Sequence, residues 1–72
     1  MKKNIKLIDL DCAHCAAKIE TAVQKIDGVT NASVNFMQQK MVLEADDARF
    51  DAALDEAVRL IRKIEPDVTV QY

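Results

Sequence analysis

Cys12 and Cys15 are the only cysteines in this 72-residue chain, and they are three positions apart. Two carboxylates, Asp9 and Asp11, lie beside them, and a segment with the apolar spacing of a helix follows. Thiolates are the ligands that soft metal ions prefer, and the positive end of a helix dipole stabilises them. Two sulfurs satisfy a linear Cu(I) ion, whereas Zn(II) or Cd(II) seeks about four ligands and stays open to a further donor. The segment therefore predicts a clamp for a soft or borderline metal ion.

Two other interpretations of the cysteine pair stay open. Small, partly buried cysteines can simply fill space in a core. A C-x-x-C sequence can also serve as a catalytic redox pair, which would make the chain a small thiol oxidoreductase. No Trp or Pro flanks this pair, and the order of elements is not the longer one of thioredoxins. Metal binding is therefore the favoured chemistry.

Length, charge and hydropathy restrict the class of protein. The 72 residues provide one domain, residues 1–72, with one small core. The net charge of −2, the lack of a basic cluster and the few aromatic residues argue against nucleic-acid binding. No apolar run approaches the roughly 20 residues of a membrane helix, and the N-terminus lacks the apolar centre of a secretion signal. We expect a cytoplasmic domain, where thiols stay reduced.

The elements that must position the cysteines follow from apolar spacing. Strands are predicted at 5–10, 29–36, 40–45 and 68–72, with helices from 13 to about 26 and from a cap at Asp46 or Asp47 to just before Pro66. Gly28 is expected to end the first helix in the left-handed conformation. The order βαββαβ with right-handed crossovers predicts a ferredoxin-like α+β fold, a four-stranded antiparallel sheet with two helices on one face. Both cysteines then lie at one edge of the domain.

Together these features resemble the heavy-metal-associated domain, a module found as free metallochaperones and as cytoplasmic N-terminal domains of metal-transporting P-type ATPases. The resemblance covers essentially the whole chain. It rests on C-x-x-C after the first strand, on Ile-Asp-Gly-Val at 26–29, on Ala-Ser-Val-Asn at 32–35 and on the order of elements. Copper-handling members usually have Gly-Met-x-Cys-x-x-Cys, whereas here Asp9 replaces the Gly and Leu10 replaces the Met as an apolar plug under the loop.

The residue directly before the first cysteine is similar to that of the Zn, Cd and Pb branch of the family, in which a carboxylate supplies an extra oxygen ligand. The resemblance thus implies that Asp11, Cys12 and Cys15 bind the metal ion. A hard oxygen suits a divalent ion, because its charge offsets the second positive charge, but it adds repulsion at a Cu(I) bis-thiolate. Asp11 is also a good helix cap, which is the structural alternative. Asp9 and His14 are further candidate ligands, although a side chain at position 14 is expected to point to solvent.

A second departure lies near the end of the second helix. Many family members have Gly followed by Tyr or Phe close to the metal loop, whereas this chain has Glu65 and Pro66. The aromatic shield over a Cu(I) site is therefore missing, although Lys63 lies nearby in the sequence. This departure also favours Zn(II), Cd(II) or Pb(II) over Cu(I).

Two functions agree with these features. The first is a regulatory or delivery domain of a P-type ATPase that exports Zn(II), Cd(II) or Pb(II), held at the cytoplasmic face of the membrane. Its partners would be the other domains of the pump or a partner metal-binding domain. The second is a free cytosolic metallochaperone, with Cu(I) among its cargoes. Nothing resembles a nucleotide site, so the domain itself is expected to be non-catalytic. We expect the domain to be a monomer. An open two-cysteine site also allows two domains to share one ion in a metal-bridged dimer.

Overall fold

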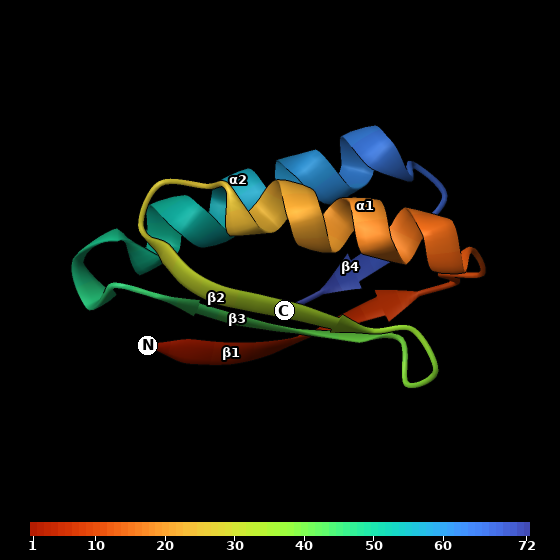
Figure 1. The fold of residues 1–72 in the computed structure, drawn as a ribbon, viewed down its shortest axis with the longest axis horizontal. Coiled ribbons are helices and arrows are strands. Elements are labelled where there is room, and N and C mark those ends of the chain that lie inside the picture. The colour runs from red at the N-terminus through yellow and green to blue at the C-terminus, as the bar shows by residue number, and fades with distance from the viewer.

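The computed structural model describes residues 1–72 and confirms the predicted order of elements (Figure 1). The elements are β1 (Lys2–Ile8), α1 (Ala13–Gln24), β2 (Val29–Asn35), β3 (Lys40–Ala45), the short 3-10 helix η1 (Asp47–Arg49), α2 (Phe50–Ile64) and β4 (Thr69–Gln71). β1 ends before the predicted residue 10, because Asp9 has a φ of +68° and turns the chain out of the strand. Neither helix is long and apolar enough to cross a membrane.

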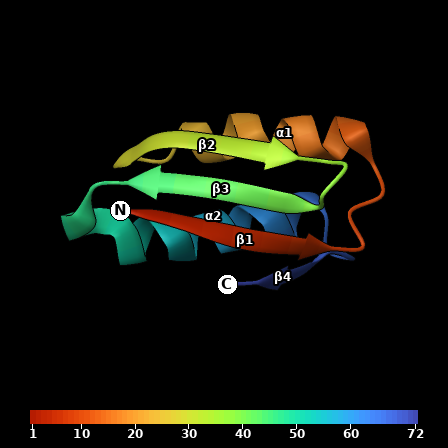
Figure 2. The same cartoon turned by 90° about the horizontal axis from the view of Figure 1, so that it is seen from below.

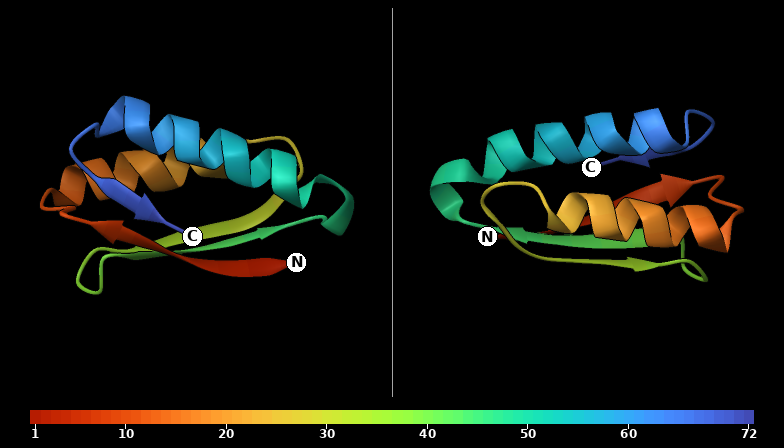
Figure 3. Two further views of the ribbon diagram at one scale, coloured as in Figure 1. Left: turned by 180° about the vertical axis from the view of Figure 1, so that it is seen from behind. Right: turned by 45° about the horizontal axis from the view of Figure 1, so that its top comes forward.

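The four strands form one antiparallel sheet in the order β2-β3-β1-β4 (Figure 2). β1 and β3 are the central strands, and β4 pairs with β1 over only a short register from Lys6 to Ile8. Both helices cover the same face of the sheet, as the two views of Figure 3 show. The ferredoxin-like fold predicted from the pattern is therefore confirmed.

The core lies between this face and the two helices, and every buried residue in it is apolar. α1 contributes Ala16, Ile19 and Val23, at the spacing of three and four that keeps side chains on one side of a helix. Leu10, in the loop before α1, has no exposed surface. The predicted apolar plug under the cysteines is thus in place, and the chain on either side of the cysteine pair is anchored in the core.

Two predicted helix ends differ in the structure. α1 ends at Gln24 rather than near residue 26, and Gly28, with a φ of +93°, lies in the turn that follows instead of capping the helix directly. The predicted side-chain cap of α2 is wrong. Asp46 makes no capping hydrogen bond, and the carboxylate of Asp47 lies 2.9 Å from the N-terminal ammonium of Met1. The chain instead enters α2 through η1, whose last turn runs directly into Phe50.

Candidate metal centre

The cysteine loop, residues 9–15, joins β1 to α1 at one end of the domain (Figure 1). It begins at Asp9, whose φ of +68° lies in the left-handed region that usually favours glycine. Aspartate reaches this region more readily than most residues, because its short polar side chain can hydrogen-bond locally. Asp9 thus adopts the left-handed conformation at the position where the copper-type motif has glycine, and the next residue, Leu10, turns into the core.

The start of α1 brings the two cysteines together. Cys12 is the N-cap residue, with φ −125° and ψ 111°, and its Sγ accepts a hydrogen bond of 3.3 Å from the backbone N–H of Cys15. Cys12 therefore caps the helix, and the structural alternative for Asp11 is wrong. Both thiols are free and only half-buried, so neither is a filler deep in the core.

The two thiols differ in acidity. Interaction with the side chain of Cys15 and the hydrogen bond from the backbone N–H of Cys15 lower the pKa of Cys12. The same pairing holds the proton on Cys15, and the nearby Glu65 carboxylate adds to the effect, so the pKa of Cys15 is raised to about 12. The expectation that the helix dipole stabilises both thiolates thus fails for Cys15. Two adjacent thiolates repel each other, and a carboxylate beside the second one opposes its ionisation further.

Glu65 is the site residue that the sequence analysis missed. It is the C-cap residue of α2, where its backbone N–H donates to the Ile61 carbonyl at 2.8 Å. Its side chain is half-buried, and its carboxylate helps to raise the pKa of the Cys15 thiol. The sequence did mark this position, because Glu65 and Pro66 stand where many family members have Gly followed by an aromatic residue. What replaces the aromatic group is therefore a carboxylate next to the sulfur pair.

The other candidate ligands lie differently. Asp9, Asp11 and His14 are exposed. No group of three or more Cys, His, Asp or Glu side chains is arranged around a common point. Metal ligation by Asp11 therefore stays a prediction, as does ligation by Cys12 and Cys15.

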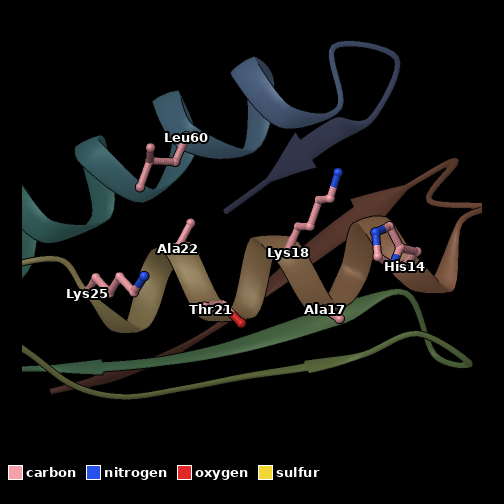
Figure 4. A pocket seen from close by; sticks show the side chains of 7 residues that line it. All are labelled: His14, Ala17, Lys18, Thr21, Ala22, Lys25 and Leu60. Atoms are coloured by element: carbon pink, nitrogen blue, oxygen red, sulfur yellow. The ribbon is translucent and has the colours of Figure 1, made fainter.

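His14 lines a surface groove of about 470 Å³ between the two helices (Figure 4). The groove residues include His14 and Lys18 on α1 and Lys25 directly after it, and Leu60 of α2 lies on the other side. His14 lies in the first turn of α1, Lys18 lies near its middle, and Lys25 lies just past its C-terminal end. The groove therefore begins at the cysteine loop and carries positive charge along α1.

A comparison with known protein families fits this geometry. The model of the heavy-metal-associated domain matches residues 5–66, which include the cysteine loop, Glu65 and most of the fold. The chain belongs to the heavy-metal-associated domain family. The family resemblance inferred from the sequence is therefore confirmed.

Relatives of this heavy-metal-associated domain divide between pumps and chaperones. The cadmium, zinc and cobalt-transporting ATPase of Bacillus subtilis is 32% identical over 71 residues, which are 99% of this chain and 10% of the ATPase. The copper chaperone CopZ of Enterococcus hirae is 36% identical over 52 residues, which are 72% of this chain and 75% of the chaperone. The chain thus spans about a tenth of the length of the ATPase.

Among solved structures, the fold matches the N-terminal domain of a potential copper-translocating P-type ATPase from Bacillus subtilis in the Cu(I)-loaded state. The TM-score is 0.79 at 27% sequence identity, over 97% of this chain and 82% of that domain. Fold and family are therefore shared by proteins named for divalent ions and by proteins named for copper.

Proposed function

We propose that this domain binds one Zn(II), Cd(II) or Pb(II) ion through Cys12, Cys15 and Asp11. Its role is that of a cytoplasmic regulatory or delivery domain in a P-type ATPase that exports the ion. The observation that carries the proposal is the sulfur pair at the start of α1, closed by the 3.3 Å hydrogen bond from the backbone N–H of Cys15 to the sulfur of Cys12. Asp11 directly precedes Cys12 in the chain, and Glu65, at the end of α2, raises the pKa of the Cys15 thiol.

The charges at the site favour a divalent ion. Two thiolates neutralise a divalent cation, and an oxygen of Asp11 adds a third ligand to the set of about four that Zn(II) prefers, which leaves room for water or a partner's side chain. A Cu(I) bis-thiolate already carries a net negative charge, so the same carboxylates add repulsion and little bonding. Glu65 adds negative charge beside Cys15, where it raises the pKa of the thiol and attracts a cation.

Metal binding must remove the proton that Cys15 holds. The raised pKa of Cys15 arises from its hydrogen bond to Cys12 and from Glu65, and a bound cation reverses both effects by attracting all three groups. The thiols are half-buried at the edge of the domain, so a partner ligand can reach the ion. This arrangement suits transfer by ligand exchange rather than permanent storage.

A free metallochaperone is the second candidate function. The similarity to the copper chaperone CopZ of Enterococcus hirae, 36% identical over 72% of this chain, supports it. The coding sequence around this chain separates the two functions. A reading frame that continues into membrane-spanning segments supports the pump domain, and a stop codon directly after Tyr72 supports the chaperone.

The metal choice is tested by substituting Asp11. We expect Asp11→Ala to weaken Zn(II) and Cd(II) binding by about tenfold or more, since it removes a charged oxygen donor, and to leave Cu(I) affinity unchanged. Competition against a chromophoric chelator measures all three ions, and Asp67→Ala is the matched control, because Asp67 is an exposed carboxylate outside the cysteine loop. An unchanged Zn(II) affinity in Asp11→Ala would contradict the assignment of Asp11.

A further inference from the structure

The turn between β2 and β3 contacts the cysteine loop, although 29 positions separate the two residues that meet. The side-chain Nε2 of Gln39 donates a hydrogen bond of 2.7 Å to the backbone carbonyl of Leu10. Next to it, the backbone N–H of Leu7 donates to the carbonyl of Gln39 at 2.8 Å. The turn and the loop lie at the same end of the domain in Figures 1 and 2. Gln39 thus ties the turn to the chain on both sides of Asp9.

Gln39 is itself held in one conformation. Its φ is +53°, and its backbone N–H donates to the carbonyl of Phe36 at 3.2 Å. The neighbouring N–H of Gln38 donates to the side chain of Asn35 at 3.0 Å, which closes the same turn. The Gln39 side chain is half-buried, so its hydrogen bond is partly shielded from competing water. A fixed backbone therefore presents a fixed donor to the loop.

The backbone carbonyl of Leu10 needs a hydrogen-bond donor from outside the sheet. β1 ends at Ile8, so Leu10 lies beyond the regular pairing of the sheet. Its side chain is fully buried, which anchors one side of the residue, and Gln39 holds the carbonyl on the other. The Leu10 carbonyl belongs to the peptide plane that leads into Asp11. With this plane held, the chain enters Asp11 and Cys12 in one direction.

We propose that Gln39 is a positioning residue for the metal site, which acts by holding the peptide between Leu10 and Asp11. The inference rests on the proposed function and adds a residue that lies outside the cysteine loop. A loop ordered before the ion arrives loses less conformational entropy on binding. Gln39 therefore raises metal affinity and slows metal release without touching the ion.

The experiment compares four forms of the domain. Gln39→Met keeps the length of the side chain and removes the donor, and Gln39→Lys keeps a donor. Gln38→Met is the matched control, because Gln38 is exposed and its side chain makes no hydrogen bond. Zn(II) affinity by chelator competition, Zn(II) release to excess chelator, the apo amide signals of Asp11 and Cys12, and the unfolding temperature are measured for each form.

We expect Gln39→Met to lose about threefold to tenfold in Zn(II) affinity, the range that one hydrogen bond supplies. Its release rate rises, and the apo amide signals of Asp11 and Cys12 shift or broaden. Gln38→Met behaves as the unsubstituted domain, and Gln39→Lys recovers most of the affinity. Equal affinity and equal amide signals in Gln39→Met and Gln38→Met would overturn the proposal. So would a loss in Gln39→Met that Gln39→Lys shares, with both unfolding temperatures lowered alike, because that result describes a general loss of stability.

Failure of the proposed function has a different signature. If the unsubstituted domain binds no divalent ion, the metal assignment to Asp11, Cys12 and Cys15 is lost. The apo amide signals then still report whether Gln39 restrains the loop. If the unsubstituted domain binds Zn(II) and the Gln39 variants follow the control, only the positioning role is lost.

Discussion

The pH dependence of metal affinity follows from the unequal acidity of the two thiols. Hydrogen bonds from Cys15 lower the pKa of Cys12, whereas the pairing with Cys12 and the nearby Glu65 raise the pKa of Cys15 to about 12. Between the lowered pKa of Cys12 and about pH 12, the free site therefore carries one thiolate and one thiol. A divalent ion binds both sulfurs as thiolates, so binding in this window releases one proton.

The size of the effect follows from that proton count. One released proton changes the apparent affinity by about tenfold for each pH unit, so acidification from pH 9 to pH 7 weakens Zn(II) binding by about a hundredfold while Cys12 stays ionised. Below the pKa of Cys12 a second proton must leave, and the slope doubles. Acidification weakens metal binding over the whole range, because protons compete with the metal ion for sulfur. Above about pH 12 neither thiol holds a proton, so the cysteines no longer make the metal affinity depend on pH.

Calorimetric titration with Cd(II) or Zn(II) in buffers of different ionisation enthalpy measures the released protons directly. Competition against a chelator, at a series of pH values, measures the slope. Glu65→Gln is the informative variant, because it removes a carboxylate that raises the pKa of Cys15 and so moves the upper end of the window to lower pH. The control is Asp67→Asn, a nearby exposed carboxylate. No proton release and no slope between pH 7 and 9 would refute the description of the site as a thiolate paired with a thiol.

Two further predictions concern the cysteines and the residue under them. Iodoacetamide at neutral pH should alkylate Cys12 before Cys15, since the thiolate is the reactive form, and peptide mass spectrometry gives the order. Modification of Cys15 first would show that the proton lies on the other sulfur. Leu10→Ala should lower the free energy of unfolding by about 2–5 kcal/mol, because it empties a fully buried position. Leu10→Met, which nearly conserves volume, should cost less than about 1.5 kcal/mol. Urea denaturation measures both, and equal losses would mean that Leu10 does not fill a packed space.

Much of the architecture was predictable, because it depends on patterns that are local in sequence. Apolar spacing placed both helices and all four strands, and the connectivity allowed only one simple arrangement. The ends of elements were less predictable. The cap expected at Asp46 or Asp47 did not form, since η1 precedes α2 and Asp47 lies beside the N-terminal ammonium of Met1. Such an end depends on a chain terminus that is distant in sequence and adjacent in space.

The candidate site also has some features that could be predicted from the sequence and others that could not. Cys12 and Cys15 could be predicted, because a separation of three residues at a helix start brings two side chains together whatever surrounds them. The left-handed conformation of Asp9 could be suspected, because it stands where a glycine is usual. The part played by Glu65 beside Cys15 was not evident, since 50 positions separate them and only the return of α2 to the cysteine end of the sheet joins them.

By itself, the sequence determined the fold class and the pair of sulfurs, which follow from apolar periodicity and from short-range spacing, and its motifs resemble those of the family. The tertiary structure alone decided what surrounds that pair. It made Cys12 rather than Asp11 the cap of α1, and it placed Gln39 against the carbonyl of Leu10. It also raised the pKa of Cys15, first through the pairing with Cys12 and then through Glu65. The physical reason is that hydrogen bonds and charges act over a few ångströms in space, and the packing of α2 and of the β2–β3 turn against the cysteine loop sets those distances.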